Sequence, residues 1–172
     1  MKITQRCNYD VVIMGAGLTG MTAAVKMAED NPHLKVAIIS KVHLVRSHSG
    51  AAQGGINAAV DREDSWQEHY YETLKGGWFL GDQDAVKLLC EAAPASIYEL
   101  DRWGASFNRD AGGHYAQRPF GGQCRNRICY VQDITGHALL TTLFEQTIAK
   151  GIEIFWEWFV FARYFPGRRV RV

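Results

Sequence analysis

Three glycines near the N-terminus have the spacing of a phosphate-binding loop. Gly15, Gly17 and Gly20 form the pattern G-x-G-x-x-G within GAGLTG. The first glycine permits a tight turn, the second leaves room for a pyrophosphate close to the backbone, and the third lets a helix pack on a strand. The start of that helix would present unpaired N–H groups to the phosphates. The spacing therefore predicts a dinucleotide-binding site.

A second segment has the composition of a backbone that lies against a flat ligand. Residues 42–59, VHLVRSHSGAAQGGINAA, consist mostly of small residues and glycines, which have little bulk to fill a core. Arg46 and His48 are its only strongly polar side chains of any reach. Taken alone, His48 is read as a histidine of a surface loop.

The elements around the glycines form a βαβ unit. Residues 11–14 (VVIM) are wholly apolar, as in a parallel strand buried on both faces, and apolar residues then recur at helical spacing to position 28. A second strand is predicted over residues 35–40. An NAD-type fold carries an acidic residue near its end, whereas this chain has Ser40 and Lys41. Ordinary NAD binding is therefore disfavoured, and the alternative is a βαβ unit without a ligand.

The bulk composition is that of one globular domain. The chain has 172 residues, of which 47% are hydrophobic and 22% charged, with a net charge of +1. This charge gives no support for a nucleic-acid or membrane-surface binder. The sequence contains neither an apolar run long enough for a membrane span nor a signal-peptide core, so we expect a cytoplasmic protein.

The four cysteines do not form a disulfide framework. They are few and scattered, at Cys7, Cys90, Cys124 and Cys129. The last two have a spacing that could supply half of a metal site, but no second pair completes it. We therefore favour reduced thiols and predict no metal.

The rest of the chain alternates helices with a loop-rich segment. Helices are predicted over residues 64–74, capped by Asp64 or Ser65, over 82–103, with a kink or break at Pro94, and over 138–150. Leu89 and Ile148 are predicted to lie on the apolar faces of the last two. Residues 105–132 form the loop-rich insertion, and residues 152–161 are predicted to form a further parallel strand.

Three arginines in the insertion could suggest nucleic-acid binding. They are Arg118, Arg125 and Arg127. Proline and paired glycines lie between them, and there is no basic helix. We therefore interpret them as solvated loop charges.

The motifs together resemble the flavoprotein subunit of succinate dehydrogenase and fumarate reductase. They are the glycine loop, S-K-V at residues 40–42, R-S-H-S-G-A-A-Q-G-G-I-N-A-A at 46–59, and R-P-F-G-G at 118–122. The resemblance implies an α/β fold with a Rossmann-like parallel sheet that binds FAD. In that family the strand end carries Ser-Lys, which removes the difficulty at Ser40.

The resemblance also implies the cofactor residues. His48 matches the histidine that carries FAD covalently, and Gln53 and Gly54 would lie near the isoalloxazine ring. Trp158, Phe159 and Val160 would approach the adenine end. The full predicted FAD set is Gly15, Ala16, Gly17, Leu18, Thr19, Gly20, Ser40, Lys41, Val42, Ser47, His48, Ser49, Gly50, Ala51, Ala52, Gln53, Gly54, Gly55, Trp158, Phe159 and Val160.

The implied activity is the interconversion of succinate and fumarate, with hydride transfer to or from the flavin. Its direction stays open. Phe120 would contact the substrate, and no catalytic residue is predicted in this chain. The implied partners are an iron–sulfur subunit and a membrane anchor, which would place the protein at the inner face of the cell membrane. L-aspartate oxidase shares the glycine loop and A-Q-G-G but lacks the flavin-bearing histidine, so His48 separates the two.

The resemblance ends near Val160, and the family proteins are several times longer. The tail, residues 162–172, changes abruptly to arginine, aromatic residues and valine. We therefore expect an FAD-binding domain over residues 1–161 that is incomplete, through truncation or loss of frame, and inactive alone. The alternative is an independent short FAD-binding module without catalysis.

Overall fold

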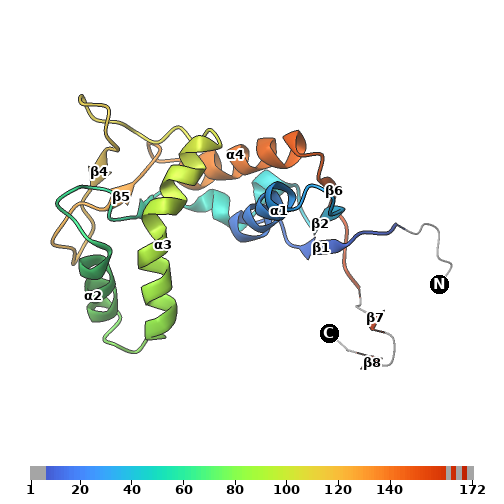
Figure 1. Cartoon of the computed structure of the whole chain (residues 1–172), viewed down its shortest axis with the longest axis horizontal. Coiled ribbons are helices and arrows are strands. Elements are labelled where there is room, and N and C mark those ends of the chain that lie inside the picture. The colour runs from blue at the N-terminus through green and yellow to red at the C-terminus, as the bar shows by residue number, and fades with distance from the viewer. Residues whose placement is uncertain (1–6, 162–163, 166–167, 170–172) are drawn as a thin grey trace. The chain divides into compact units, whose positions relative to one another are not determined.

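The computed structural model describes residues 7–161, 164–165 and 168–169 (Figure 1). They form two compact units. One contains the described residues up to Gly50 and those from Leu143 onward, and the other is Ala51–Thr142. Most of the tail predicted at residues 162–172 lies outside the described residues.

The first unit contains the predicted βαβ arrangement. Its elements are β1 (Val11–Met14), α1 (Leu18–Asp30), β2 (Val36–Ser40) and β6 (Glu153–Trp156). The three strands form one sheet in the order β1-β2-β6, and both pairings are parallel. In register, Val11 lies beside Val36, and Ala37 lies beside Glu153. The predicted α/β class with a parallel sheet is therefore confirmed.

The core of this unit lies between α1 and β2. Helix α1 packs on β1 and β2 (Figure 1). The buried residues of α1 and β2 include Met21, Ala24, Val25, Val36, Ala37 and Ile38, of which Ala37 lies on the face of the sheet opposite to Val36 and Ile38. The expectation that β1 is buried on both faces is wrong, because Val12 and Met14 are 46% and 49% exposed. Among the described residues β1 pairs only with β2, and alternate side chains point away from α1.

The predicted strand at residues 152–161 is shorter than expected. Strand β6 ends at Trp156, and Glu157 adopts a φ of +62°, which ends the extended run. The chain then returns toward the sheet, where the N–H of Trp158 donates to the carbonyl oxygen of Ser40 at 3.1 Å. Two short antiparallel strands follow, β7 (Tyr164–Phe165) and β8 (Arg168–Arg169).

The second unit combines helices with a small antiparallel sheet. The strands pair in the order β3-β5-β4. Helices α2 and α3 pack side by side (Figure 1), and α4 begins in this unit and ends in the first. The bounds are β3 (Ile56–Asn57), α2 (Trp66–Gly76), α3 (Gln83–Arg102), β4 (Gln117–Arg118), β5 (Ile128–Cys129) and α4 (Thr135–Ala149).

All three predicted helices are present, with ends that differ from the predicted ones by one to three residues, and part of their predicted packing is wrong. Ser65 caps α2 by accepting from the N–H of Glu68 at 3.2 Å. Helix α3 continues through Pro94, so the predicted break is absent. Leu89 and Ile148, which we placed on buried faces, are 60% and 56% exposed. None of the helices in the described residues is long and apolar enough to cross a membrane.

Candidate functional site: a cavity at the carboxyl ends of the strands

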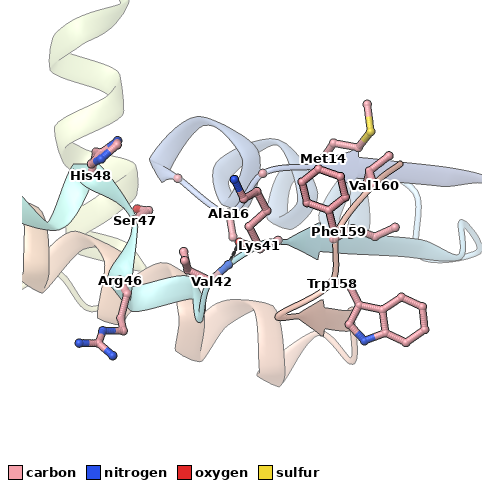
Figure 2. Close-up of a pocket in the computed structure, with 14 residues that line it drawn as sticks. Met14, Ala16, Lys41, Val42, Arg46, Ser47, His48, Trp158, Phe159 and Val160 are labelled. Carbon is pink, nitrogen blue, oxygen red and sulfur yellow. Dashed lines mark hydrogen bonds between the residues drawn. The ribbon is translucent and has the colours of Figure 1, made fainter. Parts of the chain in front are cut away.

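A cavity of about 460 Å³ lies where the three parallel strands end (Figure 2). Its walls come from the segments that follow β1, β2 and β6. Ligands of open α/β sheets bind at this edge, because the loops leaving the strands gather there. The lining residues are Met14, Gly15, Ala16, Gly17, Ile39, Ser40, Lys41, Val42, Arg46, Ser47, His48, Trp158, Phe159 and Val160.

The turn after β1 requires glycine at two positions. Gly15 has a φ of +108°, which disfavours other residues, and its N–H donates to the carbonyl oxygen of Ile39 at 2.8 Å. A Cβ on Gly20 would lie 2.1 Å from the carbonyl oxygen of Gly15. The tight turn predicted for Gly15 and the close packing predicted for Gly20 are therefore confirmed.

The start of α1 leaves N–H groups free for an anion. Gly17 is the N-cap and supplies no side chain, and the N–H of Leu18 reaches only the Ser49 Oγ at 3.4 Å. Within the described part of the chain, the N–H groups of Thr19 and Gly20 have no hydrogen-bond partner. Free N–H groups and the helix dipole together favour a bound phosphate.

The cavity is also lined by a cation, Lys41, and by two aromatic residues, Trp158 and Phe159. Lys41 follows β2, and its Nζ lies 5.6 Å from the ring centroid of Phe159. Two residues after Lys41, the ring of His43 contacts two aromatic rings. Its centroid lies 5.4 Å from that of Phe144 and 5.2 Å from that of Trp156. These contacts tie the segment that leads to His48 to α4 and β6.

His48 lies at the rim of the cavity, at the start of a short 3₁₀ turn (His48–Ala51). Its side chain is exposed, and Figure 2 shows it pointing away from that of Arg46. Ser47 differs from both: its Oγ is buried and has no hydrogen-bond partner in the described residues. A buried hydroxyl without a partner lining a cavity indicates that a polar ligand atom completes it.

The cavity gathers most of the predicted cofactor residues of the first unit. Only Met14, Ile39 and Arg46 line it without having been predicted, the first two at strand ends and the third within R-S-H. Predicted residues near it in sequence but outside its lining are Leu18, Thr19, Gly20, Ser49 and Gly50. The remaining predicted residues, Ala51–Gly55 and Phe120, belong to the second unit, where Phe120 is 62% exposed.

The interpretation as solvated loop charges is wrong for the buried Arg127 and incomplete for the half-buried Arg118, whereas Arg125 is exposed as expected. Arg127 is fully buried, and its Nε and Nη2 donate to the two carboxylate oxygens of Asp64 at 2.6 and 2.8 Å. Its Nη1 donates to Glu72. Arg125 pairs with Glu68 at 3.1 Å, and Arg118 bonds to backbone carbonyls of residues 53 and 54. Sequence reasoning missed these contacts, because the partners lie more than fifty residues away.

The buried arginine shifts the titration of its neighbours. Burial opposes ionisation of Glu72, but hydrogen bonds from Cys124 and Arg127 outweigh it and lower the pKa of that carboxyl group. Burial and the Arg127 cation lower the pKa of His69, whose Nδ1 has no partner among the described residues. Near neutral pH this cluster therefore holds an ionised carboxylate beside a neutral imidazole.

The cysteines are free thiols. Cys124 is exposed, whereas Cys129 is buried in β5, and burial raises the pKa of the Cys129 thiol to about 11. In the described residues no three histidine, cysteine or acidic side chains are grouped as metal ligands. Cys129 therefore acts as a packing residue.

The chain is similar in sequence to curated flavoprotein subunits. A succinate dehydrogenase flavoprotein subunit of Coxiella burnetii is 43% identical over 162 residues, covering 88% of this chain and 27% of that protein. A fumarate reductase flavoprotein subunit of Mycobacterium tuberculosis is 41% identical over 152 residues, covering 88% of this chain and 26% of that protein. The chain thus spans about a quarter of the length of these relatives.

A solved structure and a family profile agree with these relatives. The FrdA chain of E. coli quinol fumarate reductase superposes with a TM-score of 0.83 at 37% identity, covering 87% of this chain and 26% of that one. The profile of the FAD binding domain family matches residues 10–162. The chain therefore belongs to the FAD binding domain family, and it is similar to the flavoprotein subunits of succinate dehydrogenase and fumarate reductase.

Proposed function

We propose that this chain is the FAD-binding part of a flavoprotein that interconverts succinate and fumarate. The observation that carries the proposal is the cavity at the strand ends, since its glycine turn, free N–H groups and lining residues match what the flavoprotein resemblance implies. The names of the relatives support the substrate pair. The reaction removes or adds two hydrogen atoms across the central carbon–carbon bond of the substrate, and its direction stays open.

The residues at the cavity fit FAD. The free N–H groups of Thr19 and Gly20 would hold the pyrophosphate, and the unpaired Ser47 Oγ would bond to a polar atom of the cofactor. The predicted contacts of Ser40, Lys41 and residues 158–160 complete the walls. When bound, FAD supplies a centre that accepts two electrons and can release them one at a time. The protein's own residues bind and orient it.

The proposal includes covalent attachment of FAD at His48. The exposed imidazole lies at the rim of the cavity, where a ring nitrogen can reach the cofactor without first leaving a buried position. Attachment to an imidazole would make the flavin more electron-poor and raise its potential. His48 also separates this proposal from an L-aspartate oxidase-like protein, which would hold its FAD without a covalent bond.

The proposal extends to partners and location. Two of the relatives are flavoprotein subunits, and one of the similar solved structures is a quinol fumarate reductase. We therefore propose that the protein passes electrons to an iron–sulfur subunit held by a membrane anchor, at the inner face of the cell membrane. Phe120, exposed after β4, is proposed as a substrate contact.

The test is acid precipitation of the FAD-loaded chain, followed by measurement of the yellow flavin that stays with the protein. We expect about one acid-stable flavin per chain, its complete loss in His48→Ala, and no change in His33→Ala, which removes another exposed histidine. Flavin that binds but washes out on precipitation would reject covalent attachment and favour the L-aspartate oxidase-like alternative. A chain that takes up no flavin would reject the proposal altogether.

A further inference from the structure

The turn between α2 and α3 presents three bulky apolar side chains to solvent. Residues 78–80 lie between the end of α2 at Gly76 and the start of α3 at Gln83. Trp78 and Leu80 are 84% and 89% exposed, the largest fractions among the large hydrophobic residues of the second unit, and Phe79 is half-exposed. The turn lies at the end of the helix pair that is away from β4 and β5 (Figure 1). We call residues 78–80 the apolar tip.

The backbone of this turn satisfies its own N–H groups. The four successive N–H groups of residues 77–80 donate to carbonyl oxygens of the last turn of α2 and of the turn itself, over 2.8–3.1 Å. The N–H of Phe79, for example, donates to the carbonyl oxygen of Leu74 at 2.8 Å. An exposed loop can leave such groups to water, whereas a segment in contact with lipid must satisfy them within the protein. The apolar tip meets this requirement at all three of its N–H groups.

The left-handed conformation in this turn falls on bulky residues instead of on glycine. Trp78 and Phe79 have φ values of +54° and +57°, in the region that favours glycine. Glycines stand close by at positions 76, 77 and 81, but none of the three has a positive φ. A backbone strained at two bulky side chains indicates that these side chains serve a function beyond closing the turn.

The size and charge of the apolar tip fit a lipid surface better than a protein partner. Its three side chains expose on the order of 400 Å² of apolar surface, only half of the ~800 Å² that each partner buries in a stable protein interface. The charged residues around it are Lys75, Asp82, Asp84 and Lys87, whose charges sum to zero. Tryptophan and other large apolar side chains are favoured at the boundary between lipid headgroups and acyl chains. The apolar tip therefore fits a lipid surface without net charge.

We propose that the apolar tip is a membrane contact, which inserts Trp78, Phe79 and Leu80 among the headgroups of a zwitterionic lipid surface. The proposed function places the protein at a membrane through partner subunits, whereas this contact belongs to the chain itself and needs no FAD. Because the charges around the tip cancel, apolar contact supplies the binding. The binding therefore changes little with salt concentration.

The first measurement is binding of the full chain to phosphatidylcholine vesicles. The bound fraction is measured by flotation at low and at high salt. We expect Trp78→Ser and Leu80→Ser each to lower the partition coefficient about tenfold, because each removes a large apolar side chain from the contact. Phe161→Ser is the matched control, because Phe161 is 82% exposed but belongs to the first unit. This control should leave the partition coefficient unchanged.

The second measurement locates Trp78 in the bilayer. Phosphatidylcholine brominated on its acyl chains quenches the fluorescence of tryptophans that reach it. The chain has five tryptophans, so the contribution of Trp78 is the difference between the unsubstituted chain and Trp78→Phe. Trp78→Phe keeps an aromatic ring, so we expect it to bind vesicles almost as well and to lose most of the quenching. Quenching that is unchanged in Trp78→Phe would overturn the proposal.

Other results would also overturn the proposal. They are no vesicle binding by the unsubstituted chain, an equal loss of binding in Phe161→Ser, and binding that disappears at high salt. Sedimentation equilibrium without vesicles tests the alternative occupant: a chain that self-associates when Trp78→Ser does not would assign the apolar tip to a second copy instead of lipid. Circular dichroism checks the fold of each variant, and Leu80→Ser decides the outcome if Trp78→Ser does not fold. None of these measurements requires FAD, so failure of the proposed function would leave them interpretable.

Discussion

Replacing Arg127 should destabilise the second unit more than replacing any exposed arginine. Arg127 is fully buried, and its main partner Asp64 has a side chain that is 1% exposed. Asp64 precedes the N-cap of α2, and Arg127 precedes β5, so their ion pair joins a helix start to a sheet. Arg127→Met preserves much of the side-chain volume but leaves the Asp64 carboxylate buried without its cation.

The size of the effect follows from burial. Removing one partner of a buried ion pair costs about 3–5 kcal/mol, because the remaining charge has lost its water and its close counter-ion. Arg125 Nε lies 4.0 Å from Asp64 Oδ1 and replaces Arg127 only in part, so we expect the lower end of this range. Arg125→Gln is the comparison, because the Arg125 side chain is 40% exposed, its closest pair is with the exposed Glu68 at 3.1 Å, and it approaches Asp64 only to 4.0 Å. Such exposed pairs contribute about 0.2–1 kcal/mol. The free energy of unfolding of a typical domain is about 5–15 kcal/mol, so only Arg127→Met should bring the chain close to unfolding.

The assay is urea unfolding followed by circular dichroism, with the midpoint and slope recorded for each variant. A double variant, Arg127→Met with Asp64→Leu, removes both buried charges and should recover most of the lost stability. A loss below about 1 kcal/mol in Arg127→Met, equal to that of Arg125→Gln, would refute the reasoning, since the pair would then behave as a surface contact. A double variant no more stable than the single one would refute the role assigned to the uncompensated Asp64.

Two further predictions concern the phosphate-binding turn and acid stability. Gly20→Ala should reduce FAD binding and lower the melting temperature, because the added Cβ would lie 2.1 Å from the Gly15 carbonyl oxygen. Gly76→Ala is the control: the space around Gly76 is open, so this variant should bind FAD with unchanged affinity. Equal FAD affinity in Gly20→Ala and the unsubstituted chain would contradict this. The folded state lowers the pKa of both His69 and Glu72, so their protonation favours the unfolded chain. Stability should therefore fall as the pH decreases below about 6.5, where an ordinary histidine gains its proton, and fall again near pH 4, where an ordinary glutamate does. Melting temperatures from pH 8 to pH 3.5 check this sign, and a melting temperature that rises on acidification would refute it.

The features predicted correctly from sequence are those fixed by near neighbours. The turn at Gly15, the packing at Gly20 and the cap at Ser65 depend on residues a few positions away, so spacing alone reveals them. Burial was harder to predict. The periodicity that placed Leu89 and Ile148 on apolar faces says which side of a helix is apolar, but not whether another element covers it.

The arginines were misread for a different reason. The partners of Arg118 and Arg127 are 65 and 63 residues away in sequence, and no local pattern joins them. The loop-rich composition around them suggested solvent exposure. Only the pairing of β3 and β4 with β5 brings these segments together.

The composition of the glycine-rich segment explains why charged contacts hold it. Residues 49–55 are small except for Gln53, so a backbone built from them can lie close to a flat ligand but offers little apolar surface for packing. Directional bonds from a guanidinium fix such a backbone without adding bulk on the ligand side. Arg118 supplies these bonds to residues 53 and 54, and Arg127 fixes the strand next to them. A loop built mostly of glycine and alanine therefore needs polar contacts to fix its backbone, and in this chain arginines from the insertion provide them.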